Sequence, residues 1–170
     1  MIRACAFDLG NTLSDDASIY DRSLAEFAER LAAENLVDDA ERFTHVFDRI
    51  NRQFEVPYVS HTFGESGMFR LAFRELGISG LDPETALARY RKQVVGNTRL
   101  DPSIRDALGW LREQGVRLAL LSNERAARVE AWFEATGARE LFDLEFVSER
   151  AGVEKPAPGF FTAALERIGV

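Results

Sequence analysis

The chain has 170 residues, 46% of them hydrophobic, and a formal net charge of -7. That length suits one α/β domain carrying an insertion, with enough apolar residues for a packed core. The acidic balance argues against a nucleic-acid partner, which would need clustered Lys and Arg. A single cysteine excludes an intrachain disulfide framework, and no apolar run approaches the roughly 20 residues of a membrane span. We therefore expect a cytoplasmic globular protein that binds neither nucleic acid nor membrane.

The chain begins with an apolar run over residues 2–7, followed by Asp8 and Gly10. A short apolar run that ends in a turn is typical of a buried parallel strand. The carboxyl ends of such strands are where open α/β sheets bind their ligands. Asp8 is therefore the first candidate for a functional residue.

Residues 14–96 predict four helices with no strand between them. Apolar residues recur at i, i+3, i+4 and i+7 spacing over 24–31, and similar patterns follow over 43–54 and 68–76. The dipeptide Asp82-Pro83 is typical of an N-cap followed by proline at the first helical position, so it begins the fourth helix. We expect these residues to form a separate helical insert.

Strands and helices alternate after this insert. Asp101-Pro102 predicts a helix start and Gly115 its end, and apolar strands follow over 116–121 and 144–147, each leading into a further helix. This order predicts an α/β fold with a doubly wound parallel sheet and an inserted four-helix cap. The expected domains are a core over residues 1–13 and 97–170 and a cap over residues 14–96.

Three polar side chains follow the three predicted strands: Asp8, Ser122 and Lys155. Parallel strands bring their carboxyl ends to one edge of the sheet, so a carboxylate, a hydroxyl and an ammonium group should converge there. Taken singly, Asp8 and Ser122 could cap the helices that follow them, and Lys155 could be a solvated loop residue. Their joint placement favours a functional site.

Three sequence motifs carry a resemblance to a known family. They are AFDLGNTL at residues 6–13, LALLSN at 118–123 and GVEKPAP at 152–158. In this order, with a helical insert after the first, they resemble the motifs of the haloacid dehalogenase superfamily, whose insert is a mobile helical cap. The resemblance covers essentially the whole chain.

The resemblance implies hydrolysis of a small-molecule phosphate monoester through an aspartyl-phosphate intermediate. Asp8 would attack phosphorus and, with the backbone carbonyl of Gly10, would bind Mg²⁺. Ser122, Asn123 and Lys155 would act with Asp8 as catalytic residues that stabilise the transferring phosphoryl group. The phosphate-binding groups would come from Leu9, Gly10, Ser122, Asn123 and Lys155.

Two departures from the family pattern stand out. The position two residues after the nucleophile is usually an aspartate that transfers protons, but here it is Gly10, and a lost general acid or base costs about 10²- to 10⁴-fold in rate. The family's fourth motif, which supplies further magnesium ligands, does not appear before Val170. From this we expect weak magnesium binding and an exposed edge strand over residues 2–7 that is open to self-association.

Two other functions remain open at this point. One is a metal-independent 2-haloacid dehalogenase, because those enzymes also lack an acid at the position of Gly10, although they usually carry an aromatic residue there. The other is a truncated relative without turnover. Among the remaining polar residues, His45 and His61 are interpreted as solvated or core side chains. The arginines over residues 125–128 are interpreted as part of a solvated helix face.

Overall fold

The computed structural model describes residues 2–54 and 65–169. The chain divides into two compact units. The α/β unit comprises Met1–Ala17 and Thr98–Val170, and the helical unit comprises Ser18–Asn97. The expected boundaries were 13/14 and 96/97. The first observed boundary lies further along the chain because the opening residues of the first long helix belong to the α/β unit.

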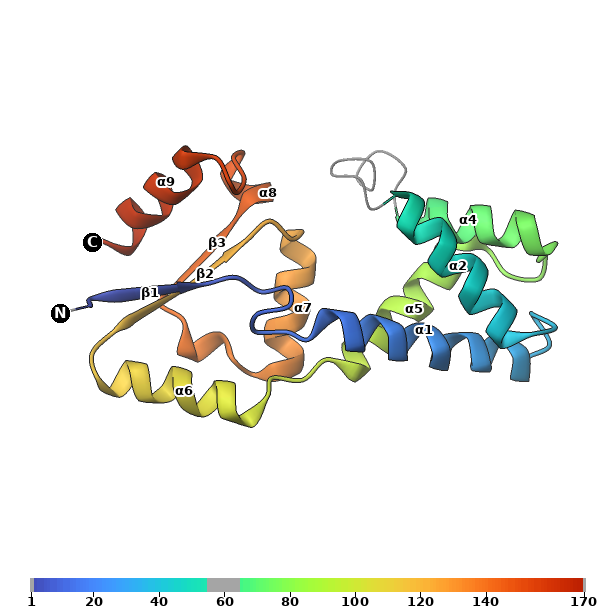
Figure 1. The fold of residues 1–170 in the computed structure, drawn as a ribbon, viewed down its shortest axis with the longest axis horizontal. Helices are drawn as coiled ribbons and strands as arrows, with labels where there is room; N and C mark the ends of the chain where they lie inside the picture. Colours follow the sequence, from blue (N-terminus) through green and yellow to red (C-terminus); the bar gives the residue numbers. More distant parts are fainter. Residues whose placement is uncertain (1, 55–64, 170) are drawn as a thin grey trace. The chain divides into compact units, whose positions relative to one another are not determined.

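The α/β unit contains a parallel sheet of three strands in the order β1-β2-β3 (Figure 1). The strands are β1 (Ala4–Phe7), β2 (Arg117–Ser122) and β3 (Leu144–Val147). Phe7 pairs with Leu120, and Ser122 pairs with Val147, so the strands end close to one another. β1 lies at an edge of this sheet. Its use for self-association stays a prediction.

Alternating side chains of β2 pack on opposite faces of the sheet. Leu118 and Leu120 pack with residues of α6 (Pro102–Glu113) and α7 (Ala126–Thr136). Ala119 and Leu121 pack on the other face with α9 (Pro158–Ile168). A strand that is buried on both faces is continuously apolar, as β2 is over residues 118–121. Helices on both faces of a parallel sheet confirm the predicted doubly wound α/β fold (Figure 1).

The predicted helix ends are also present. The Asp101 carboxylate accepts a hydrogen bond from the Ser103 amide at 2.8 Å, so it caps α6. Gly115 follows α6 with a φ of 75°, a left-handed conformation that favours glycine. Two short elements were not predicted, a 3-10 helix at Arg139–Leu141 and α8 at Ser148–Ala151. Elements of one turn are too short to show a periodic pattern.

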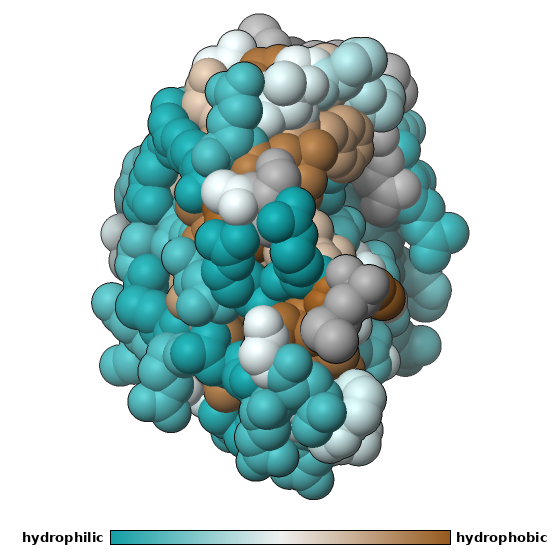
Figure 2. All heavy atoms as spheres, turned by 90° about the vertical axis from the view of Figure 1, so that its left-hand side faces the viewer, coloured by the Kyte–Doolittle hydropathy of each residue, from teal (hydrophilic) through white to brown (hydrophobic). Residues whose placement is uncertain are grey.

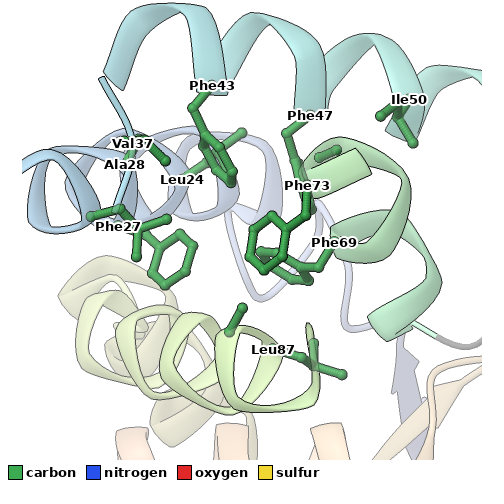
Figure 3. Close-up of a cluster of buried hydrophobic side chains, with 13 residues drawn as sticks. Leu24, Phe27, Ala28, Val37, Phe43, Phe47, Ile50, Phe69, Phe73 and Leu87 are labelled. Atoms are coloured by element: carbon green, nitrogen blue, oxygen red, sulfur yellow. The ribbon is translucent and has the colours of Figure 1, made fainter. Parts of the chain in front are cut away.

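The helical unit is built around packed aromatic rings (Figure 3). Its described helices are α1 (Asp16–Ala33), α2 (Ala40–Phe54), α4 (Glu65–Leu76) and α5 (Pro83–Asn97). Phe69 of α4 is 1% exposed, and its ring centroid lies 4.7 Å from that of Phe47 and 5.7 Å from that of Phe27. These helices therefore share a core of their own, separate from the clusters on the sheet.

Some large apolar side chains remain exposed on the α/β unit. Phe161 and Leu165 of α9 are 41% and 53% exposed, and Ile2, just before β1, is 70% exposed. Figure 2 shows the side of the α/β unit at which β1 begins and α9 ends, with hydrophobic patches between hydrophilic side chains. Within the described residues, no helix is long and apolar enough to cross a membrane.

Candidate active site

Asp8 directly follows β1 and is held by a tight turn. The Leu9 carbonyl accepts hydrogen bonds from the amides of Thr12, Leu13 and Ser14 at 3.3, 3.0 and 3.0 Å. The Leu9 side chain is fully buried beneath this turn. The Asp8 side chain, in contrast, is 47% exposed. The turn therefore buries Leu9 in the core and leaves the carboxylate of Asp8 accessible at the carboxyl end of β1.

The loop after β2 is joined to the loop that carries Lys155. The Asn123 side chain accepts a hydrogen bond from the Lys155 amide at 2.8 Å and donates one to the Lys155 carbonyl at 2.9 Å. Ser122 is fully buried, and its Oγ accepts a hydrogen bond from the Glu124 amide at 3.0 Å. Both side-chain polar groups of Asn123 thus fix the backbone at Lys155, and its side chain positions that loop.

Lys155 brings the three loops together. Its Nζ lies 2.6 Å from Asp8 Oδ1 and donates a second hydrogen bond to the Leu121 carbonyl at 2.9 Å. The Lys155 side chain is 21% exposed, so its charge is partly withdrawn from solvent. A fixed ammonium group beside an accessible carboxylate can bind an anionic group that approaches Asp8. The structure thus places Asp8, Ser122, Asn123 and Lys155 in one region.

A second cluster of charged groups lies beside Gly10. If residue 10 had a Cβ, this atom would stand 2.9 Å from Asp16 Oδ2 and 4.0 Å from Glu124 Oε1. Asp16 is only 7% exposed. In Arg128 of α7, Nη2 lies 2.8 Å from Asp16 Oδ1, and Nε lies 3.4 Å from Glu124 Oε2. A buried carboxylate therefore occupies the space that a side chain at residue 10 would need.

The sequence pattern did not predict this cluster. Arg128 was interpreted as part of a solvated helix face, but its side chain is 21% exposed and paired with two carboxylates. That interpretation is wrong because helical periodicity does not reveal which distant loop meets a helix. One signal was available: Asp16 and Arg128 both lie shortly after a motif, Asp16 after the first and Arg128 after the second.

A surface ion network connects the elements that precede the Lys155 loop. Arg150 of α8 pairs with Glu130 of α7 at 3.0 Å and with Glu145 of β3 at 2.6 Å. Arg139 also pairs with both of these glutamates. The hydrogen bond from Arg150, helped by the charge of Arg139, lowers the pKa of the Glu130 carboxyl below its ordinary value. The network therefore ties α7, β3 and α8 together on the exposed surface.

The residues that could hold Mg²⁺ are few in the described part of the chain. No group of three or more His, Cys, Asp and Glu residues suited to a metal ion occurs there. The Asp8 carboxylate and the Gly10 carbonyl are oxygen donors of the kind that Mg²⁺ prefers, and this ion usually keeps several water ligands. This small donor set fits Mg²⁺ in its chemistry. His45 is exposed on α2, and His61 lies outside the described residues.

Comparison with known proteins identifies the family. Residues 2–170 match the haloacid dehalogenase-like hydrolases. The match covers essentially the whole chain, in agreement with the fold and with the three motifs at the carboxyl ends of the strands. The chain therefore belongs to the haloacid dehalogenase-like hydrolase family.

Similar proteins include several that are named as phosphatases. The chain is 26% identical to the glyceraldehyde 3-phosphate phosphatase of Methanopyrus kandleri, matching 100% of this chain and 72% of that protein. It is 29% identical to the ribulose-1,5-bisphosphate 5-phosphatase of Halopiger xanaduensis, covering 99% of this chain and 72% of that one. A Thermotoga maritima crystal structure assigned as a β-phosphoglucomutase superposes with a TM-score of 0.70 at 19% identity, covering 99% and 72% of the two chains. This likeness shows a common fold.

Proposed function

We propose that this hydrolase cleaves small-molecule phosphate monoesters, with Asp8 as the covalent nucleophile. The observation that carries the proposal is the Lys155 Nζ, fixed 2.6 Å from Asp8 Oδ1 at the carboxyl end of the sheet. This arrangement combines an accessible nucleophile with a cation for the phosphoryl oxygens. The names of the two phosphatase relatives support the same reaction class.

The reaction would proceed in two steps. An Asp8 carboxylate oxygen attacks phosphorus, the bond to the ester oxygen breaks, and that oxygen keeps the electron pair and takes a proton from solvent water to leave as the alcohol. Lys155 stabilises the charge on the phosphoryl oxygens, together with backbone amides of the loops after β1 and β2. Water then attacks phosphorus and gives up a proton, and the bond between phosphorus and the Asp8 oxygen breaks, which releases inorganic phosphate and regenerates the free carboxylate. Asn123 contributes by holding the backbone at Lys155.

We further propose that Mg²⁺ assists this reaction. The Asp8 carboxylate and the Gly10 carbonyl would hold the ion in the described part of the chain. When bound, the ion supplies additional positive charge to the phosphoryl oxygens. Magnesium dependence is measured by comparing activity and calorimetric binding with and without added Mg²⁺.

We also propose that the helical unit, Ser18–Asn97, is the cap of this enzyme. It has its own hydrophobic core, and only two chain connections join it to the α/β unit. A unit built in this way can move as a body and exclude water from a reaction.

The test of the proposed function is Asp8→Asn, which keeps the size of the side chain and removes the nucleophilic charge. The control is Asp106→Asn on the exposed face of α6. Phosphate release from p-nitrophenyl phosphate should be abolished in Asp8→Asn and retained in the control. Mass spectrometry of quenched wild-type protein should find a phosphoryl group on Asp8. Retained turnover in Asp8→Asn, or halide release from a 2-haloacid in place of phosphate release, would refute the proposal.

A further inference from the structure

We propose that Asp16 supplies the carboxylate that residue 10 lacks, and that it accepts a proton from the water that releases phosphate from Asp8. This inference rests on the proposed function. It assigns a catalytic role to a residue outside the three sequence motifs. Asp16 belongs to the same compact unit as Asp8 and Gly10, so their placement does not depend on the position of the helical unit.

The position of the Asp16 carboxylate is the first argument. Its Oδ2 lies 2.9 Å from the point where a Cβ on Gly10 would stand, whereas the next nearest oxygen, Glu124 Oε1, is at 4.0 Å. A side chain at residue 10 would therefore meet the Asp16 carboxylate at its first carbon atom. Asp16 therefore brings a carboxylate oxygen close to residue 10, the position two residues after the nucleophile where the side chain is missing.

The way Asp16 is held is the second argument. Arg128 pairs with Oδ1 at 2.8 Å, which leaves Oδ2 as the oxygen nearest to Gly10. The Asn11 side chain accepts a hydrogen bond from the Ala17 amide at 3.3 Å, which ties the start of α1 to the turn after Asp8. The Asp16 side chain is 9% exposed. A short, buried side chain that is paired with Arg128 is preorganised for proton transfer in a way that a solvated one is not.

The chemistry assigns Asp16 to the second step. Asp8 attacks as a carboxylate and loses no proton, so the first step needs no base. In the second step a water oxygen bonds to phosphorus, the phosphorus bond to Asp8 breaks with its electron pair returning to Asp8, and the water proton moves to Asp16. A positioned general base contributes about 10²- to 10⁴-fold to such a step. Removal of the base should therefore trap the phosphorylated enzyme.

The test compares Asp16→Asn with the matched control Glu124→Gln. Both changes remove one carboxylate charge beside Arg128, but Glu124 lies farther from Gly10 and its side chain is 38% exposed. Rapid-quench measurements with an aryl phosphate give the rate of phosphorylation and the rate of dephosphorylation separately. Asp16→Asn should phosphorylate Asp8 at a near-normal rate and release phosphate about 10²- to 10⁴-fold more slowly. Glu124→Gln should show no accumulation of phosphorylated enzyme.

Two further variants test the role of Asp16 separately from its contribution to folding. Arg128 retains Glu124 as a partner in Asp16→Asn, so the variant should fold. If it does not, Asp16→Asn with Arg128→Gln removes both charges of the pair and is measured in the same way. Asp16→Gly combined with Gly10→Asp moves the carboxylate to residue 10 and should restore phosphate release at least tenfold over Asp16→Gly alone.

The results separate this inference from the proposed function. A wild-type enzyme that forms no phosphoryl-Asp8 would refute the proposed function and the inference together. The inference alone would be overturned if the wild-type enzyme forms phosphoryl-Asp8 and Asp16→Asn is dephosphorylated within threefold of the wild-type rate. Slow phosphorylation without accumulation in Asp16→Asn would also overturn it, because Asp16 would then support only the structure of the site.

Discussion

The contact between Gly10 and Asp16 predicts a measurable steric coupling. In Gly10→Ala, the new Cβ would lie 2.9 Å from Asp16 Oδ2, closer than carbon and oxygen atoms normally approach. The Asp16 carboxylate cannot withdraw freely because Arg128 pairs with it at 2.8 Å. Overpacking of this kind costs about 1–3 kcal/mol. Replacement of glycine by alanine also stabilises by ~0.4–1 kcal/mol, through the entropy of the unfolded chain.

The balance of these effects predicts a net loss of about 1 kcal/mol in the free energy of unfolding. The same change in an Asp16→Ala background should stabilise by ~0.4–1 kcal/mol, because the remaining neighbour, Glu124 Oε1, is at an ordinary contact distance of 4.0 Å. Urea denaturation of the four proteins of this double-mutant cycle gives the coupling energy. Gly109→Ala is the control, since a Cβ at Gly109 would meet no atom within 4 Å.

Two results would refute this reasoning. The first is a Gly10→Ala variant that is as stable as the wild type or more stable. The second is a coupling energy below about 0.5 kcal/mol, because residues in contact normally show 0.5–3 kcal/mol. Either result would mean that the Asp16 carboxylate does not occupy the space beside Gly10 in solution.

Three other predictions concern the site, the helical core and the ion network. Lys155→Met should lower kcat on an aryl phosphate by about 10²- to 10³-fold, since one charged donor to the transition state is lost. Circular dichroism should show that the variant keeps its fold, and activity within threefold of the wild type would contradict this prediction. Phe69→Ala should reduce the free energy of unfolding of the helical unit, measured by urea denaturation, by about 3–5 kcal/mol, because Phe69 is 1% exposed within the aromatic core. An unchanged unfolding transition would show that this core is not formed. Because Arg150 lowers the pKa of Glu130, the stabilisation from this pair is present at neutral pH and is lost as the pH falls through the lowered pKa. Glu130→Gln should therefore reduce the melting temperature slightly at neutral pH and have no effect in acid; an equal effect at both pH values would argue against the ion pair.

The sequence by itself determined the order of the elements and the residues at the ends of the strands. β2 is apolar on both faces, which predicted a buried parallel strand. Asp101-Pro102 and Gly115 predicted the limits of α6, because caps and left-handed glycines are local features. Local chemistry of this kind can be read directly from neighbouring residues.

The pairing of side chains that are distant in sequence was decided only by the tertiary structure. The sequence did not show that the Asn123 side chain holds the Lys155 backbone by two hydrogen bonds. The family resemblance identified Gly10 as the position of a missing acid, but it did not show that Asp16 lies beside Gly10 or that Arg128 pairs with Asp16. These contacts join the start of α1 to α7, and neither hydrophobic period nor turn chemistry encodes which buried charges will meet. They depend on how the helices pack against the sheet, which is a property of the whole fold.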